Sequence, residues 1–164
     1  MVLFLIASHY LMGSHRQDRA ETIVVVDDEP VALEFCVTTL KRAGYQVFTA
    51  SSGQQALTFF QPNRSPVDLA LVDIVMPGMS GIELVRRLEK LDTDTKVVLM
   101  SGYSPDEIQR VVGDGASDYR CMWKPFEAGA LVQMIGNVLA KREQNRESLG
   151  ESTKARLIPQ KSSG

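Results

Sequence analysis

Short apolar segments alternate with longer amphipathic segments along most of this chain. The first apolar segment, residues 23–26, is rich in β-branched side chains and stops at Asp27 and Asp28. Such a run is typical of a strand that is buried on both faces of a sheet. Pro30 then stands early in a segment whose apolar residues recur at helical spacing, and Gly44 follows its end. The pattern predicts a buried strand followed by an amphipathic helix.

The same alternation then repeats along the chain. We expect further strands at 46–49, 69–72, 97–100 and 120–123, and helices at 53–60, 81–91, 105–112 and 128–141. Five strand and helix units predict an α/β fold, in which helices cover both faces of a parallel sheet and right-handed crossovers join the strands. Functional side chains of such sheets lie at the carboxyl ends of the strands, near a switch in strand order.

The composition changes at both ends of this repeating region. We expect residues 21–141 to form one domain, because 164 residues with 44% hydrophobic side chains suffice for a single core. Residues 142–164 are polar and charged and are predicted to be a disordered tail. Residues 1–20 would be an extension that is disordered or foreign to the domain. Its apolar run at 2–7 is too short to span a bilayer and lacks the features of a secretory signal, although amphipathic docking of this run stays open.

The charge and the cysteine count narrow the classes of function. The formal net charge is -2, with six Lys or Arg against three Asp or Glu from Lys141 onward and about -5 before that point. No dense basic surface of the kind that binds nucleic acid is therefore expected. The two cysteines, Cys36 and Cys121, lie in apolar segments. We expect buried thiols rather than a disulfide, and a reducing compartment such as the cytoplasm.

Polar side chains stand where four of the predicted strands end. Asp27 and Asp28 follow the first strand, Asp73 the third, Ser101 the fourth and Lys124 the fifth. Taken one at a time, each has an ordinary explanation as a helix cap or a solvated side chain. Because the carboxyl ends of parallel strands share one edge of the sheet, we expect these side chains to meet there.

Three carboxylates in one place repel one another and raise each other's pKa unless a cation compensates. Oxygen ligands favour a hard ion, so we expect Mg²⁺, and both histidines, His9 and His15, lie in the N-terminal extension. Beside such an ion Asp73 can attack phosphorus as a nucleophile. Lys124 would neutralise the phosphoryl oxygens and Ser101 would donate a hydrogen bond to one of them. The site is therefore predicted to take part in phosphoryl transfer.

Four motifs in order along the chain resemble the receiver domain of response regulators. They are Asp-Asp-Glu-Pro at 27–30, Val-Asp-Ile-Val-Met-Pro-Gly-Met-Ser-Gly at 72–81, Ser-Gly at 101–102 and Lys-Pro-Phe at 124–126. The resemblance covers residues 21–141. It implies a flavodoxin-like, doubly wound, five-stranded parallel sheet with strand order 2-1-3-4-5 and helices on both faces.

The resemblance also implies a role for each residue of the site. Asp73 would be the phosphoacceptor, Lys124 would contact the phosphoryl group, and Ser101 would be the switch hydroxyl that turns toward the phosphate. The peptide bond between Lys124 and Pro125 would be cis. The implied metal ligands are Asp28 and Asp73 directly, Asp27 through water, and Val75 through its backbone carbonyl.

One position departs from the family pattern. Receivers often carry an aromatic switch residue three positions before the lysine, and here that position is Cys121, flanked by Tyr119 and Trp123. Coupling between phosphorylation and the output surface is therefore expected to use another side chain or to be weaker. The Ser-Gly-Tyr-Ser run at 101–104 is similar to receivers of hybrid sensor kinases, although stand-alone regulators share it.

The function implied by the resemblance is that of a phosphorylation-dependent receiver in a two-component system or phosphorelay. The donor would be a histidine kinase or a histidine phosphotransfer protein, and the target would be a protein. Phosphorylation would shift a two-state equilibrium toward a form in which the helix at 105–112 is rearranged. The chain would be a cytoplasmic regulatory domain rather than an enzyme, although it would assist its own phosphorylation and dephosphorylation. Neither nucleic-acid binding nor a membrane span is expected, and a homodimer stays open.

Two other functions fit part of the pattern. An aspartyl-nucleophile phosphohydrolase on a related sheet would need a second acid two residues after Asp73, and that position holds Val75. An interaction module that works without phosphorylation would not need the complete set of acids, serine and lysine. The residues therefore favour the phosphoacceptor over both alternatives.

Overall fold

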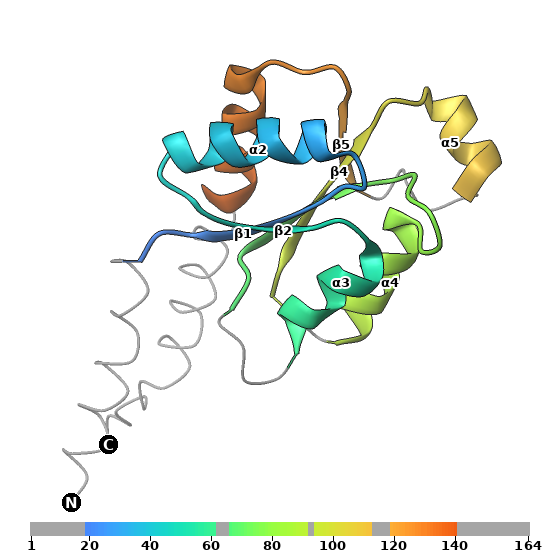
Figure 1. Ribbon diagram of the computed structural model, residues 1–164, viewed down its shortest axis with the longest axis horizontal. Coiled ribbons are helices and arrows are strands. Elements are labelled where there is room, and N and C mark those ends of the chain that lie inside the picture. The colour runs from blue at the N-terminus through green and yellow to red at the C-terminus, as the bar shows by residue number, and fades with distance from the viewer. Residues whose placement is uncertain (1–18, 62–65, 92–93, 113–118, 141–164) are drawn as a thin grey trace, which may run out of the picture.

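The computed structural model of this chain describes residues 19–61, 66–91, 94–112 and 119–140. The strands are β1 (Thr22–Val26), β2 (Gln46–Ala50), β3 (Leu69–Asp73), β4 (Lys96–Ser101) and β5 (Arg120–Trp123). The helices are α2 (Pro30–Arg42), α3 (Gly53–Ala56), the 3-10 helix η1 (Leu57–Phe60), α4 (Gly81–Lys90), α5 (Pro105–Val112) and a last helix at 128–140 (Figure 1). Most of the predicted N-terminal extension and the whole predicted tail lie outside the described residues.

The strands form one parallel sheet of order β2-β1-β3-β4-β5. Figure 1 shows α2 and the last helix, in orange, on one face of this sheet, and α3 and α4 on the other. The order reverses direction at β1, so the strands on either side of it are connected over opposite faces. This arrangement confirms the predicted doubly wound, flavodoxin-like fold.

Alternating side chains of the central strands supply a core on each face. Val24 and Val72 pack with residues of α3 and α4, while Ile23 and Leu71 pack with residues of α2 and the last helix. All four are completely buried, because both faces of β1 and β3 are covered by helices. The wholly apolar strands that the sequence showed are therefore the two central ones, together with most of β4.

The segment at 53–60 differs from the single helix that the sequence predicted. It begins as α3, where the Ser52 side chain accepts a hydrogen bond from the backbone N–H of Gln55. After Ala56 the chain tightens into η1, where the Phe59 ring packs against Phe48 of β2 at a centroid distance of 5.6 Å. Threonine and phenylalanine are weaker helix formers than alanine or leucine, so packing decides the conformation of this turn.

A partly buried ion pair links the residues just before β1 and β3. Arg19 Nη2 donates hydrogen bonds to Oδ1 and Oδ2 of Asp68, at 2.8 and 2.7 Å. The backbone N–H of Thr22 also donates to Asp68 Oδ2, at 2.8 Å. Asp68 is only 4% exposed, so this pairing offsets the cost of burying its charge. This pair lies at the end of the sheet opposite to the carboxyl ends of the strands, where the candidate functional residues stand.

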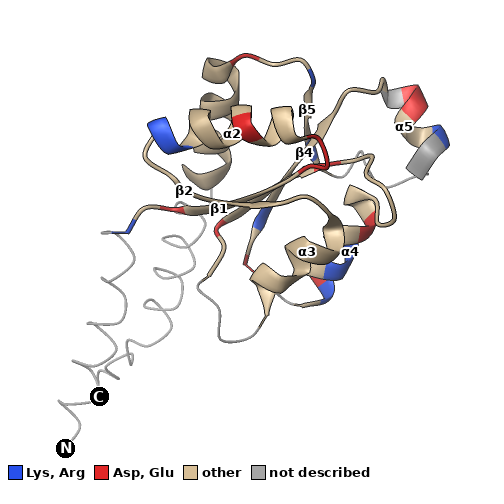
Figure 2. Cartoon of the chain, viewed as in Figure 1, with Lys and Arg blue, Asp and Glu red and all other residues tan. Residues whose placement is uncertain are grey.

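The surface of the described helices carries both signs of charge. Figure 2 shows Lys and Arg interspersed with Asp and Glu on α4 and α5. An exposed pair at helical spacing joins Arg87 to Glu83 on α4, at 2.6 Å. None of the described helices is long and apolar enough to cross a membrane.

Candidate functional site

The carboxyl ends of four strands lie together at one edge of the sheet. Asp27 directly follows β1, Asp73 is the last residue of β3, Ser101 is the last residue of β4, and Lys124 directly follows β5. The parallel register sets Ser101 beside Trp123, the residue before Lys124. Strand topology therefore delivers two acids, a hydroxyl and an ammonium to one place.

Lys124 joins the two acids that follow β1 and close β3. Its Nζ lies 2.6 Å from Asp27 Oδ2 and 2.7 Å from Asp73 Oδ1. The backbone N–H of Glu29 donates to Asp27 Oδ1 at 2.9 Å, and the backbone N–H of Val75 donates to Asp73 Oδ2 at 2.9 Å. Each carboxylate oxygen of the pair thus has a donor, as buried charged groups require.

Two buried carboxylates and one ammonium give this cluster an excess of negative charge. Asp27 is 0% and Asp73 is 6% exposed. Burial raises the pKa of Asp73 and the charge of Asp27 adds to that effect, while Lys124 and the N–H of Val75 oppose it only in part. Burial alone would lower the pKa of Lys124, but its bonds to both acids raise the pKa overall. One ammonium therefore serves two carboxylates, and a further cation would relieve the remaining charge.

The hydroxyl of Ser101 is engaged by its own loop. Its Oγ accepts a hydrogen bond from the backbone N–H of Tyr103 at 3.0 Å and lies 3.4 Å from the carbonyl oxygen of Tyr103. Ser101 is buried, and its backbone carbonyl accepts a bond of 2.7 Å from the N–H of Lys124. Main-chain contacts thus tie the ends of β4 and β5 together, while the serine side chain binds the start of the loop to α5.

The predicted metal ligands are only partly gathered in this structure. Asp28 is exposed, whereas Asp27 and Asp73 are drawn to Lys124. Among the described residues, no three Asp, Glu, His or Cys side chains are grouped so that they could hold a metal ion as they stand. The chemistry nevertheless fits Mg²⁺, because the donors are all oxygen and their charge exceeds that of the single lysine.

The loop after Asp73 approaches its own strand very closely. An added Cβ at Gly81, the first residue of α4, would lie 2.1 Å from the carbonyl oxygen of Asp73. The N–H of Gly81 donates to the carbonyl of Ile74 at 2.9 Å, which closes the loop. Within the loop, Gly78 has φ +78°, a conformation that favours glycine.

The bond between Lys124 and Pro125 is cis, as predicted.

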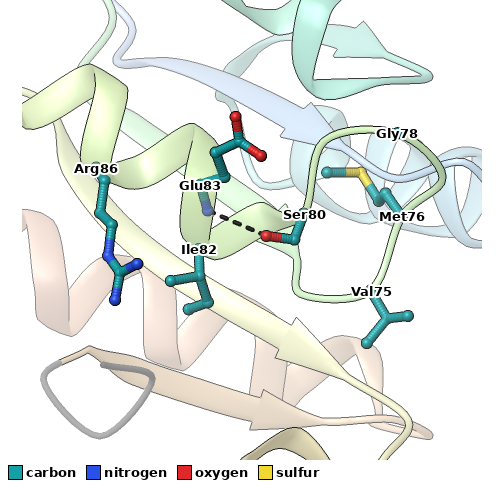
Figure 3. A pocket seen from close by; sticks show the side chains of 7 residues that line it. All are labelled: Val75, Met76, Gly78, Ser80, Ile82, Glu83 and Arg86. Carbon is teal, nitrogen blue, oxygen red and sulfur yellow. Dashed lines mark hydrogen bonds between the residues drawn. The ribbon is translucent and has the colours of Figure 1, made fainter. Parts of the chain in front are cut away.

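A shallow pocket of about 380 Å³ lies beside this loop. Figure 3 shows its lining, in which Val75 and Met76 come from the loop and Ile82 and Arg86 from α4. The hydrogen bond that begins α4, from the N–H of Glu83 to Ser80 Oγ at 3.2 Å, lies at its wall. The carboxylates bound by Lys124 do not line it, so the pocket adjoins the charged cluster without containing it.

Both cysteines lie near the charged cluster, and both are free thiols. Burial raises the pKa of Cys36 to about 11, and the charge of Asp27 adds to this while Lys124 opposes it. Burial and the charge of Asp73 likewise raise the pKa of Cys121 to about 11. The thiols therefore stay protonated and unreactive at neutral pH. Cys36 is buried as expected, whereas Cys121 is only partly buried.

Sequence reasoning missed the residues that shape the loop. The sequence pattern marks Gly81 only as a helix start, and Gly53 only as the beginning of a predicted helix. Glycine is a poor choice inside a helix, so its presence at the first position of both α3 and α4 was the available signal that another group approaches closely. The engagement of Ser101 by the backbone of Tyr103 had no signal in the sequence.

Replacing Asp73 by Asn should stabilise the metal-free protein at neutral pH. The pKa of Asp73 in the folded state lies above its ordinary value of 3.8. This group therefore favours folding below its unfolded pKa, and the contribution is lost as the pH rises through the folded pKa. Asn has nearly the same shape without the charge, so the variant should have the higher thermal midpoint at neutral pH, and its advantage should shrink in acid.

The matched control for that measurement is Asp28→Asn, which removes an exposed carboxylate from the same edge of the sheet. Its midpoint should stay close to that of the wild type, because surface substitutions usually change stability by less than about 0.5 kcal/mol. An Asp73→Asn midpoint below that of the wild type at neutral pH would show that the ion pair with Lys124 outweighs the burial of the charge.

Comparison with known proteins agrees with this arrangement. A profile described as response regulator receiver domain matches residues 23–136. The response regulator receiver protein CpdR of Brucella abortus is 34% identical over 122 residues, which cover 71% of this chain and 95% of CpdR. The sensor kinase CckA of the same organism is 33% identical over 122 residues, which cover 74% of this chain but 13% of the kinase.

Solved structures give the same result. The response regulator TrrA of Thermotoga maritima, in complex with Mg²⁺ and beryllium fluoride, is 34% identical, with a TM-score of 0.61 and coverage of 73% of this chain and 99% of that one. The chain spans about half the length of other curated response regulators, 47% of one and 53% of another. From the family match and the strand order together, this chain belongs to the response regulator receiver domain family.

Proposed function

We propose that this chain is a signalling receiver that accepts a phosphoryl group on Asp73. The observation that carries the proposal is the position of Lys124, whose ammonium contacts Asp73 and Asp27 at once. The raised pKa of Asp73 marks a basic carboxylate, and a basic carboxylate is the better nucleophile once it is ionised. The ammonium of Lys124 beside it can neutralise the negative charge of the phosphoryl oxygens.

The proposed reaction moves phosphorus from a donor to this carboxylate. An ionised oxygen of Asp73 forms a bond to phosphorus while the bond from phosphorus to the donor breaks, and the electron pair leaves with the donor atom. Lys124 then exchanges its contact with Asp73 for a phosphoryl oxygen. Asp27 keeps the ammonium in place during this exchange, because it holds the same Nζ at 2.6 Å.

We assign Mg²⁺ to the same site, held by Asp28, Asp73 and the backbone carbonyl of Val75, with Asp27 acting through water. When bound, the ion would offset the negative charge that gathers on the phosphoryl oxygens. The excess of carboxylates over ammonium groups supports this assignment. The similar protein TrrA was solved in complex with Mg²⁺ and beryllium fluoride, which supports the same chemistry here.

Ser101 is the proposed switch. To donate to a phosphoryl oxygen, its hydroxyl must give up its contact with the carbonyl oxygen of Tyr103 at 3.4 Å. The loop between β4 and α5 would then rearrange and carry α5 with it. Because Cys121 stands where receivers often have an aromatic residue and is a small, partly buried thiol, this loop would carry the response without an aromatic partner at that position.

The proposed setting follows from the family. The donor is a histidine kinase or a histidine phosphotransfer protein, the target is a protein, and the reaction takes place in the cytoplasm. We take residues 21–141 as the receiver, with 1–20 and 142–164 as an extension and a tail. Similarity to part of CckA, a sensor kinase, and to nearly the whole of CpdR supports both a hybrid kinase and a stand-alone regulator as the parent protein.

Beryllium fluoride, which imitates a phosphoryl group on aspartate, provides the direct test of this function. With Mg²⁺ it should raise the thermal midpoint of the wild type, because a ligand at a hundred times its Kd stabilises the folded state by about 2.7 kcal/mol. Asp73→Ala should show no such rise, and the wild type should show little without Mg²⁺. Equal stabilisation of wild type and Asp73→Ala would reject Asp73 as the acceptor.

A further inference from the structure

The loop between β3 and α4, residues 74–80, is held at its two ends and also at one point in between. At the ends, the N–H of Gly81 bonds to the carbonyl of Ile74. In between, the buried side chain of Met79 lies directly over Gly53, the first residue of α3. A Cβ at Gly53 would be 2.7 Å from Met79 Sδ, 3.0 Å from its Cγ and 3.1 Å from its Cβ. The start of α3 therefore packs against this loop at Met79.

Which atoms of Met79 a side chain at Gly53 would clash with decides whether the loop must move. A clash with Sδ alone would be relieved by turning the flexible end of Met79. The contact extends to Met79 Cβ, which cannot move away without its backbone. Since Met79 stands two residues before Gly81, a shift of that backbone displaces the loop that follows Asp73 and contains Val75.

The segment that carries Gly53 also touches the other acid of the site. The backbone N–H of Asp27 donates to the carbonyl of Ala50, the last residue of β2, at 3.1 Å. The stretch from Ala50 to Gly53 therefore contacts the main chain at Asp27 and, through Met79, the loop after Asp73. It sets the two acids relative to each other from outside the cluster.

We infer that Met79, seated over Gly53, is a positioning residue for cation and phosphoryl binding at Asp73. It acts through the loop and touches none of the reacting groups. This inference rests on the proposed function, because it concerns the same site. It adds that the start of α3, which contributes no side chain to the charged cluster, controls how well that cluster binds.

The test is an NMR titration of the whole chain with MgCl₂, compared between Gly53→Ala and Gly129→Ala. Gly129 also stands in the first turn of a helix, and a Cβ there would meet nothing within 4 Å. Gly53→Ala should weaken Mg²⁺ binding about fivefold, since displacements of a fraction of an ångström already reduce the fit of a binding site. It should also shift the Val75 and Gly81 amide signals before any Mg²⁺ is added, and Gly129→Ala should do neither.

The double variant Gly53→Ala with Met79→Ala separates positioning from general damage. Met79→Ala removes Sδ and Cγ, the atoms at 2.7 and 3.0 Å, and leaves only Cβ at 3.1 Å. The double variant should therefore fold and bind Mg²⁺ nearly as Met79→Ala alone does, even if Gly53→Ala folds poorly. Wild-type binding by Gly53→Ala, with unmoved Val75 and Gly81 amides, would overturn the inference and leave the proposed function standing. Absence of Mg²⁺ binding by the wild type would instead reject the proposed function. The Val75 and Gly81 amide signals of metal-free Gly53→Ala would then still test whether Met79 on Gly53 positions the loop: shifted signals would support that contact, and unchanged signals would reject it.

Discussion

Incubation with acetyl phosphate and Mg²⁺ should add one phosphoryl group to the wild-type chain and none to Asp73→Asn. The amide of asparagine is no nucleophile toward phosphorus, although it preserves the shape of the side chain. Asp27 is not expected to take over the reaction, because its 0% exposure leaves a phosphoryl donor no access, whereas Asp73 keeps 6% of its surface exposed. Intact-mass analysis in the presence and absence of Mg²⁺ measures the result directly.

The matched control for this experiment is Asp68→Asn. Asp68 is also a buried aspartate in an ion pair, but it lies at the opposite end of β3 and pairs with Arg19. That variant should be phosphorylated like the wild type once circular dichroism shows that it is folded. Equal labelling of the wild type and Asp73→Asn, or loss of labelling in folded Asp68→Asn alone, would contradict the assignment of Asp73.

Gly81→Ala should produce the largest loss of stability of the substitutions considered. Its Cβ would lie 2.1 Å from the carbonyl oxygen and 2.9 Å from the carbonyl carbon of Asp73, and these are main-chain atoms that no rotamer change can move. Either α4 must move away from β3 or the strand end must distort. We expect a loss of about 3 kcal/mol or more in the free energy of unfolding, at the upper end of the range for overpacked sites.

Urea denaturation of Gly81→Ala and Gly129→Ala makes the comparison. Gly129 lies in the first turn of the last helix with open space around it, so alanine there should be neutral or stabilise by up to about 1 kcal/mol through its higher helix propensity. A Gly81→Ala variant as stable as Gly129→Ala would mean that the close approach of α4 to the backbone of Asp73 is wrong.

The sequence was a good guide to the strands because burial leaves a simple record. β1 and β3 are covered on both faces and are therefore apolar at nearly every position, so both their location and the first polar residue beyond them could be predicted. β5, an edge strand with exposed Arg120 and Trp123, was recognisable only from its place in the alternation. Where helix propensity was weak, at 53–60, the predicted helical segment is present, but it is α-helical only to Ala56 and 3-10 from Leu57, where Phe59 packs against Phe48.

For the candidate site, the residue types and their edge of the sheet followed from the sequence, because strands of one direction bring their ends together regardless of the details of packing. Which groups actually bond to one another did not follow. Lys124 pairs with Asp27 and Asp73 while Asp28 remains exposed, and Ser101 bonds to Tyr103. These contacts depend on the paths of the loops, which the apolar pattern does not specify.

By itself, the order of apolar and polar residues determined the α/β class, the number of strands and the set of side chains at their carboxyl ends. Periodicity follows from local geometry, and the alternation of strands with helices makes the strands parallel. Tertiary structure alone decided that Gly81 lies against the backbone of Asp73 and that Met79 rests on Gly53. Such contacts join segments that are distant in sequence or separated by a loop, and an absent side chain leaves no hydrophobic pattern to read.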